Sequence, residues 1–174
     1  MDFKKLANQY RDELLDNVLP FWLEHSQDLE FGGYFSCLDR EGKVFDTDKF
    51  IWLQGREVWM FSMLYNKVEK RQEWLDCAVQ GGEFLKKYGH DGNYNWYFSL
   101  DRSGRPLVEP YNIFSYTFAT MAFGQLSLAT GNQEYADIAK KTFEIILSKV
   151  SNPKGKWNKL HPGTRNEELR PPDD

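Results

Sequence analysis

The feature that most constrains the fold is a short segment that occurs twice. Residues 34–43 have the sequence YFSCLDREGK, and residues 97–105 have the similar sequence YFSLDRSGR. Four residues recur 62 positions later: Leu38, Asp39, Arg40 and Gly42 correspond to Leu100, Asp101, Arg102 and Gly104. In each copy an aromatic run leads into a turn, because Asp favours a turn start and glycine tolerates a positive φ. A period of about 60 residues fits two helices plus a β-hairpin, so a duplicated unit is predicted.

The apolar pattern around the two hairpins predicts five helices. Apolar residues at intervals of three and four mark an amphipathic helix from Phe3 to His25, which Pro20 is expected to kink near its end. Four further helices are predicted over residues of about 52–70, 73–88, 111–130 and 133–150. Adding 62 maps Phe61 onto Phe123, so the repeat extends from the hairpin into the helix cores.

These elements favour an all-α fold with short β-hairpin inserts, in which inner and outer helices alternate. The helix at 111–130 is apolar or small almost all round, as expected for an inner-layer helix covered on both sides. Five helices do not supply enough neighbours to close such a layer into a ring. We therefore expect residues 1–174 to be an incomplete N-terminal portion of a single helical domain.

The composition excludes several classes of partner. Aromatic residues make up 16% of the chain, so some rings are expected to line a concave surface. The formal net charge is −4 without a basic patch, so nucleic acid is not an expected partner and the ligand should be neutral or weakly charged. The N-terminus lacks a signal-peptide core and no apolar run could span a membrane, which predicts a cytoplasmic protein. Cys37 and Cys77 are too few for a disulfide framework or a zinc site, so free thiols and no metal or cofactor are expected.

The most distinctive segment is KFIWLQGREVWMFSMLY, residues 49–65. At the start of the predicted inner helix, Trp52, Gln54 and Arg56 offer one pocket an aromatic face, an amide and a fixed positive charge. The planar donor fork of Arg56 can grip a carbonyl or hydroxyl oxygen and does not lose its proton. The alternative is that Arg56 is paired with a carboxylate such as Glu30 or Asp48.

The repeat separates the two candidate positions. Adding 62 takes Trp52 to Phe114, which is another aromatic residue, but it takes Arg56 to Phe118. The repeated fold therefore requires an aromatic ring at the position of Trp52, and it does not require arginine at the position of Arg56.

Residues 21–65 resemble the N-terminal region of the N-acylglucosamine 2-epimerase family, known in animals as renin-binding protein. The order of features is similar: a helix, Gly-Gly, a Leu-Asp-Arg-x-Gly hairpin, then Trp-Leu-Gln-Gly-Arg. GGEFL at 81–85, NIFSYTFATMAF at 112–123 and HPGTR at 161–165 also match the family's pattern. The resemblance covers nearly the whole chain.

The resemblance implies an (α/α)6 barrel of six inner and six outer helices, with a sugar bound in a funnel at one end. The family includes epimerases of N-acetylglucosamine and N-acetylmannosamine, epimerases of cellobiose and isomerases of mannose. All begin by removing the proton on C2 of the open-chain sugar, which gives an enediolate or, in N-acyl sugars, its amino counterpart. An epimerase returns a proton to the opposite face of C2, whereas an isomerase protonates C1. Dimerisation is common in the family, so a homodimer is expected.

The resemblance also implies a role for each candidate residue. Arg56 would contact the sugar oxygen near C1 and stabilise the developing anion. Trp52 would stack on the sugar or form the pocket wall beside Gln54, and Phe114 and Tyr116 would face the same funnel from the neighbouring inner helix. Cellobiose-type members tend to have Tyr at the position of Phe114, which favours the N-acylhexosamine branch. Several relatives carry an acid or amide at the position of Tyr116.

The catalytic histidines of the family do not transfer to this sequence. Two histidines act as its acid–base pair, since imidazole titrates close to working pH, and each is followed by Glu after three or two residues. His25, His90 and His161 have no Glu at those offsets. We therefore expect all three to be structural or solvent-facing, and the 174-residue chain by itself to lack the acid–base pair and to be inactive.

A sugar 2-epimerase of N-acylglucosamine type is thus the leading hypothesis. A mannose-type aldose–ketose isomerase and a cellobiose-type 2-epimerase share most of these features, and product analysis would separate them. A hypothesis of another class is a non-catalytic helical-repeat module that binds a protein, in which Arg56→Ala would leave binding intact. A glycoside hydrolase would need two carboxylates across a cleft. Asp39, Asp101 and Glu109 are available, but the first two belong to the hairpin turns.

Overall fold

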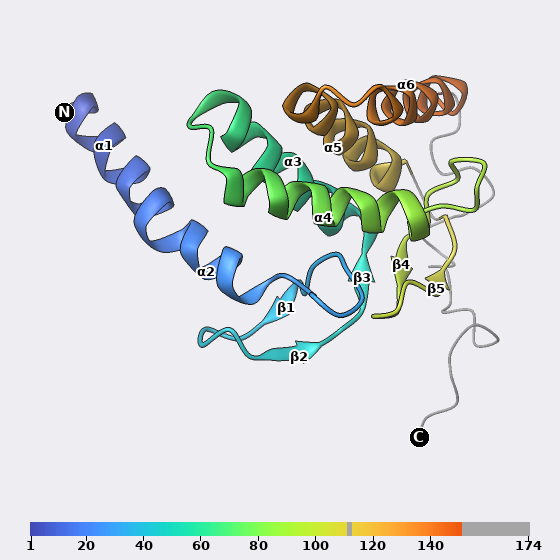
Figure 1. Cartoon of the computed structure of the whole chain (residues 1–174), viewed down its shortest axis with the longest axis horizontal. Helices are drawn as coiled ribbons and strands as arrows, with labels where there is room; N and C mark the ends of the chain where they lie inside the picture. The colour runs from blue at the N-terminus through green and yellow to red at the C-terminus, as the bar shows by residue number, and fades with distance from the viewer. Residues whose placement is uncertain (111–112, 151–174) are drawn as a thin grey trace.

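The computed structural model describes residues 1–110 and 113–150. Its helical elements in chain order are α1 (Phe3–Glu13), the π-helical segment η1 (Leu14–Val18), α2 (Leu19–His25), α3 (Ile51–Lys67), α4 (Gln72–Tyr88), α5 (Phe114–Thr130) and α6 (Gln133–Ser148) (Figure 1). Its strands are β1 (Cys37–Leu38), β2 (Val44–Asp46), β3 (Lys49–Phe50), β4 (Ser99–Leu100) and β5 (Pro106–Val108). The prediction of an all-α fold with short hairpin inserts is confirmed.

Pro20 was expected to kink the first helix near the end of that helix. The interruption lies instead before Pro20, in the π-helical segment η1. The backbone N–H of Leu19 donates to the carbonyl of Leu14, which makes the π-helical turn of η1. Pro20 then lies in the first turn of α2, where its missing N–H donor is tolerated. The π-turn thus takes up the register change that the proline requires. α1 buries none of its residues and lies at the edge of the molecule (Figure 1).

The duplicated hairpin is confirmed strand by strand. β1 pairs with β2 and β4 pairs with β5, both antiparallel, and both strands of the second hairpin lie 62 residues after their counterparts. Asp39 and Asp101 act alike, because each carboxylate accepts the backbone N–H of the residue four positions later at 2.8 Å. Gly42 and Gly104 hold positive φ angles of 83° and 95°, which other residues rarely adopt. The two hairpins therefore share the same turn-forming aspartate bond and the same positive-φ glycine.

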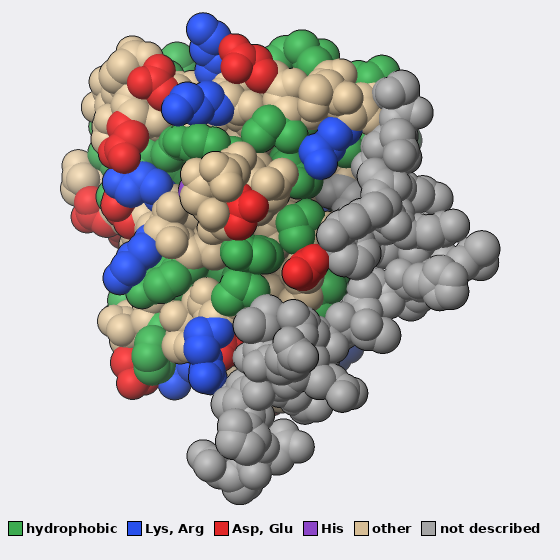
Figure 2. Space-filling view, turned by 90° about the vertical axis from the view of Figure 1, so that its right-hand side faces the viewer, with side chains coloured by type: hydrophobic (Ala, Val, Ile, Leu, Met, Phe, Trp, Pro, Cys, Tyr) green, Lys and Arg blue, Asp and Glu red, His purple; other side chains and the backbone are tan. Residues whose placement is uncertain are grey.

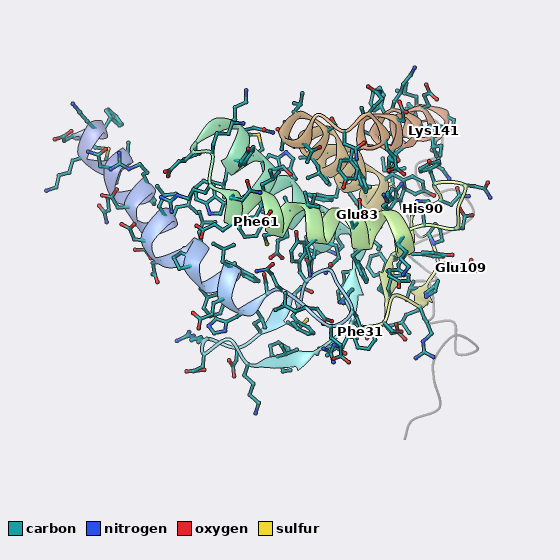
Figure 3. All side chains as sticks on the ribbon, viewed as in Figure 1. Phe31, Phe61, Glu83, His90, Glu109 and Lys141 are labelled. Carbon is teal, nitrogen blue, oxygen red and sulfur yellow. The ribbon has the colours of Figure 1, made fainter. Side chains whose placement is uncertain are left out.

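The helices form two layers. α3 packs against α5, while α4 covers α3 and α6 covers α5 (Figure 1). Phe61 of α3, labelled in Figure 3, and Phe123 of α5 are related by 62 residues, and both are fully buried. Gly55 allows α3 and α5 to approach closely, since a Cβ atom there would lie 3.0 Å from the backbone of Phe118. Within the described residues α5 is covered on one side, and its other side exposes three large side chains: Phe114, Met121 and Leu128.

The second hairpin is joined to the start of α3. β4 lies between β3 and β5 in a three-stranded antiparallel sheet, so a strand just before α3 pairs with a strand of the next unit.

On the face in Figure 2, Lys and Arg side chains are intermixed with Asp and Glu. None of the helices in the described part of the chain has the length and apolarity to cross a membrane. Cys37 and Cys77 are free thiols, as predicted, and burial raises the pKa of Cys77.

Candidate functional site

Two of the predicted site residues share one face of α3. Trp52 and Arg56 are four residues apart, which places them one above the other on the helix. Arg56 is exposed, and the structure of residues 1–110 and 113–150 gives it no ion pair. The alternative pairing with a carboxylate is not found in these residues: Glu30 pairs with Arg102 at 2.9 Å, and no ion pair joins Arg56 to Asp48. Arg56 therefore keeps its donors available to a ligand.

Aromatic side chains from α5 adjoin this face. The rings of Trp52 and Phe118 lie 5.9 Å apart, centre to centre, with their planes inclined at 53°. Phe114, one helical turn before Phe118, is 59% exposed. We call Trp52, Arg56, Phe114 and Phe118 the aromatic–arginine face. Phe118 was not among the predicted site residues, although its position 62 residues after Arg56 was a usable signal.

Gln54 lies on a different side of α3 and does not join Trp52 and Arg56 as expected. Its side chain is fully buried, and its Nε2 donates to the carbonyl of Tyr34 at 2.8 Å. Its Oε1 accepts the backbone N–H of Tyr34, also at 2.8 Å. The amide is thus used within the protein, where it joins α3 to the loop before the first hairpin.

Tyr116 likewise lies on a buried side of α5, away from Phe114. Its hydroxyl donates to Oδ1 of Asn95 at 3.4 Å, and the Nζ of Lys149 lies 5.1 Å from its ring centre. Burial raises the pKa of Tyr116 to about 12, so the hydroxyl remains protonated at neutral pH. The expectation that Tyr116 faces the same surface as Phe114 is corrected by this geometry.

Glu57 follows Arg56 in sequence but turns its carboxyl inward. The hydroxyl of Ser26, a fully buried residue, donates to Oε1 of Glu57 at 2.5 Å. Burial raises the pKa of Glu57 to about 8. At neutral pH Glu57 is therefore largely protonated, and it does not neutralise the charge of Arg56.

The two histidines of the described chain lie away from the aromatic–arginine face. The ring of His25, at the end of α2, lies 4.9 Å from the ring of Phe21. His90 follows α4 (Figure 3), where its ring stacks on Tyr94 at 4.7 Å and meets Trp96 at 4.9 Å. Burial lowers the pKa of His90. His161 and the HPGTR segment lie outside the described residues.

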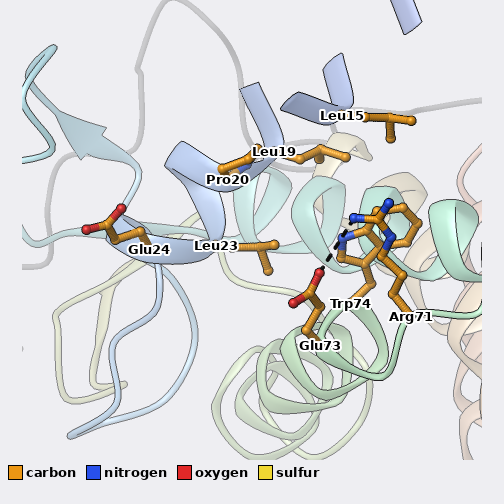
Figure 4. A pocket seen from close by; sticks show the side chains of 8 residues that line it. All are labelled: Leu15, Leu19, Pro20, Leu23, Glu24, Arg71, Glu73 and Trp74. Atoms are coloured by element: carbon orange, nitrogen blue, oxygen red, sulfur yellow. Dashed lines mark ion pairs between the residues drawn. The ribbon is translucent and has the colours of Figure 1, made fainter. Parts of the chain in front are cut away.

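Other features of the surface do not add to this site. A groove of about 380 Å³ separates α2 from the start of α4 (Figure 4), and none of its lining residues belongs to the aromatic–arginine face: Leu15, Leu19, Pro20, Leu23, Glu24, Arg71, Glu73 and Trp74. The carboxylates of Asp39 and Asp101 are each used by their own turns. Within residues 1–110 and 113–150, no three His, Cys, Asp or Glu side chains gather in a way that could hold a metal ion. The face offers aromatic stacking and a guanidinium donor.

Comparisons with a family model and with known proteins point to the same family. A family model described as N-acylglucosamine 2-epimerase matches residues 33–173. The chain is 44% identical over 140 residues to N-acylglucosamine 2-epimerase of Mus musculus, a match that covers 78% of this chain and 33% of that protein. It is 29% identical over 167 residues to cellobiose 2-epimerase of Dictyoglomus turgidum, covering 91% of this chain and 42% of that protein. The chain thus spans about a third of the length of the mouse relative.

Solved structures give the same picture of the fold. The crystal structure of a sugar epimerase from a ruminal bacterium superposes with a TM-score of 0.76 at 29% identity, covering 83% of this chain and 37% of the other. The crystal structure of a D-mannose isomerase superposes with a TM-score of 0.68 at 20% identity, covering 76% of this chain and 34% of the other. At that identity the second likeness concerns the fold alone.

Proposed function

Because the chain belongs to the N-acylglucosamine 2-epimerase family, we propose that it forms the N-terminal portion of a carbohydrate 2-epimerase that interconverts N-acetylglucosamine and N-acetylmannosamine. The observation that carries the proposal is the exposed guanidinium of Arg56, which has no carboxylate partner in the described structure and lies one turn from Trp52. The choice of an N-acyl sugar is supported by 44% identity to the mouse N-acylglucosamine 2-epimerase, against 29% to the cellobiose enzyme. Phe114 in place of the tyrosine of cellobiose-type members agrees with this choice. Assembly into a homodimer and a cytoplasmic location stay predictions.

In this proposal Arg56 stabilises the anion formed at the first step. Removal of the C2 proton of the open-chain sugar moves electron density onto the oxygen at C1. A guanidinium held in place beforehand donates to that oxygen, and one such donor contributes a rate factor of about 10²–10³. Trp52, Phe114 and Phe118 would stack on the C–H faces of the sugar and orient C2. The proton that leaves one face of C2 is replaced by a proton delivered to the opposite face, so the product is the epimer.

The acid–base pair of this reaction is assigned to residues beyond those described. His25 and His90 pack on other aromatic rings and do not share a face with Arg56. The chain therefore supplies the anion-stabilising and sugar-stacking half of the site, and a second part of the barrel supplies the base and the acid. On this division of roles, the 174-residue chain binds the sugar but does not exchange its C2 proton.

The test is proton exchange at C2 of N-acetylmannosamine in heavy water, followed by NMR. The chain alone should bind the sugar without incorporating deuterium. A fusion of the chain to the C-terminal two thirds of the mouse relative should incorporate deuterium at C2 and form N-acetylglucosamine. Exchange by the chain alone would overturn the division of roles, and absence of sugar binding by the chain would count against the sugar function. Formation of a ketose in place of the epimer would favour the mannose-type isomerase.

A further inference from the structure

Lys49, the first residue of β3, is fully buried and fully hydrogen-bonded. Its ammonium donates to Oδ2 of Asp28 at 2.9 Å, to the carbonyl of Gly32 at 2.5 Å and to the carbonyl of Arg102 at 2.9 Å. The side chains of Lys49 and Asp28 are both inaccessible to solvent. A buried lysine is tolerated when its charge is paired and all its donors are used, and both conditions hold here.

Arg102 completes this cluster from the turn of the second hairpin. Its Nε and Nη2 donate to the two carboxylate oxygens of Asp28 at 3.0 and 3.1 Å, and Nη2 lies 2.9 Å from Glu30. Its guanidinium carbon lies 5.0 Å from the ring centre of Phe31, which is labelled in Figure 3. Burial acts to raise the pKa of Asp28, but the hydrogen bonds from Arg102 and Lys49 prevail and lower it. The two cations and two carboxylates balance in charge.

The second unit forms a similar but shorter loop without such a cluster. The bridge between Gln27 and Tyr34 closes the loop of the first unit, and the bridge between His90 and Trp96 closes that of the second. The residue that follows Gln27 is Asp28, and the residue that follows His90 is Asp91. Asp91 is exposed, and its carboxylate accepts from the backbone N–H groups of Asn93 and Asn95 and from the side-chain amide of Asn95. A buried Lys–Asp pair with an arginine beside it is thus not needed to form such a loop.

The first hairpin also lacks the contact that Arg102 makes. Arg40 is the counterpart of Arg102, but it is exposed and has no ion pair in the described part of the chain. The hairpin turns are otherwise alike, as the bonds of Asp39 and Asp101 demonstrate. The cluster therefore belongs to the junction between the two units and not to the hairpin as such.

This junction holds the first turn of α3. Lys49 and Phe50 pair with β4, and the backbone N–H of Ile51 donates to the carbonyl of Phe98 at 3.0 Å. No side chain caps the N-terminus of α3. The position of this turn thus depends on the second hairpin, which Arg102 anchors to Asp28. Trp52 directly follows Ile51 in the chain. A shift of the second hairpin would therefore move Trp52 and the aromatic–arginine face.

We propose that Arg102 is a positioning residue for the sugar site, acting through the Asp28–Lys49 pair to hold Trp52 and Arg56 in place. The inference rests on the proposed function only for the identity of the ligand. Its structural half, that Arg102 clamps the start of α3, stands on the contacts described above. The two halves are tested by separate measurements.

Backbone hydrogen exchange and binding of N-acetylmannosamine are measured on the 174-residue chain and three variants. Arg102→Met removes the donor fork and keeps the length of the side chain, while Arg102→Lys keeps the charge and loses the fork. Arg40→Met is the matched control in the first hairpin. For Arg102→Met we expect exchange about tenfold faster at residues 49–53 and 98–101, unchanged exchange in α6, and sugar affinity about tenfold weaker. Arg102→Lys should fall between Arg102→Met and the unsubstituted chain, and Arg40→Met should match the unsubstituted chain.

Several outcomes would overturn the proposal. Unchanged exchange at residues 49–53 in Arg102→Met, or an equal acceleration in all the helices, would refute the clamp. Local loosening with unchanged sugar affinity would refute the positioning role. Failure of the unsubstituted chain to bind the sugar would count against the proposed function itself, and the exchange pattern would still decide whether the clamp exists.

Discussion

Gln54 and Tyr116, which lie 62 residues apart, each join an inner helix to the loop before the hairpin of its own unit. Gln54 bonds to both backbone groups of Tyr34, and the hydroxyl of Tyr116 bonds to Asn95. The repeat therefore preserves the direction of the side chain and changes its chemistry. Each residue thus acts within its own unit, from the buried side of its helix, while Trp52 and Arg56 remain on the other side of α3.

Gln54→Leu should destabilise the protein strongly. The substitution leaves the buried N–H and carbonyl of Tyr34 without partners, and each unpaired group costs about 1–3 kcal/mol, so the free energy of unfolding should fall by about 2–6 kcal/mol. Tyr116→Phe removes one long hydrogen bond and should cost about 1 kcal/mol or less. Urea unfolding of both variants measures the difference. A Gln54→Leu variant as stable as the unsubstituted chain would contradict the assigned role.

Arg56→Met should weaken binding of N-acetylmannosamine without changing stability. Arg56 is exposed and has no ion pair in the described structure, and substitutions at such positions change stability by less than about 0.5 kcal/mol. Loss of a charged donor to a sugar oxygen should weaken binding at least about tenfold. Titration calorimetry and thermal unfolding of the same sample separate the two effects. Arg105→Met, on the exposed second hairpin turn, serves as the control, and equal binding by both variants would argue against a sugar contact at Arg56.

Glu57 should make stability decrease as the pH rises from mildly acidic to mildly alkaline. Burial raises its pKa from 4.5 to about 8, so between these values the native state holds a proton that the unfolded state has released. The free energy of unfolding should then fall by up to about 1.4 kcal/mol per pH unit and level off above the raised pKa. Ser26 is the hydrogen-bond partner of this carboxyl, and Tyr34 and Cys77 are its titratable neighbours.

Glu57→Gln isolates this contribution, because the amide keeps the shape of the side chain and does not ionise. The free energy of unfolding of the unsubstituted chain, minus that of Glu57→Gln, should fall from pH 5 to pH 8 and stay constant at higher pH. Urea unfolding at several pH values gives both curves. Parallel curves over this range would mean that Glu57 is charged in the folded protein at neutral pH.

Gly55→Ala should separate the two inner helices. An added Cβ would lie 3.0 Å from the backbone of Phe118, which cannot yield as a flexible side chain would. Overpacking of this kind costs about 1–3 kcal/mol. Gly124→Ala is the matched control on α5, where an added Cβ meets nothing within 4 Å, and it should stabilise the helix by about 0.5–1 kcal/mol. Opposite signs in thermal unfolding are expected, and stabilisation by both substitutions would contradict the close approach of α3 and α5.

Much of the local structure was predictable from the sequence because it depends on nearby residues. The apolar spacing within 52–70 predicted four buried positions on α3. Val58, Phe61 and Leu64 are indeed buried, whereas Tyr65 is only half-buried. The predicted end of this helix was three residues too late, since the chain leaves helical geometry after Lys67. Trp52 and Arg56 share a face because four residues make one helical turn, and that much also follows from the sequence.

The rest of the candidate site depended on contacts between distant segments. Gln54 is two residues from both Trp52 and Arg56, and its side of the helix became a buried one only because the loop at Tyr34 packs there. The pairing of Asp28 with Arg102 joins residues 74 positions apart, and nothing in either segment alone distinguishes Arg102 from Arg40.

The sequence by itself determined the units of this protein, and the tertiary structure decided how they meet. Helix spacing, turn-forming Asp and Gly, and the 62-residue period act through the nearest neighbours along the chain, so they hold wherever the segment is placed. The partner of a polar side chain is set by whichever segment packs against it, because burial makes an unpaired polar group costly and a paired one acceptable. For that reason Arg40 and Arg102 have a similar local sequence setting and different surroundings in the folded chain.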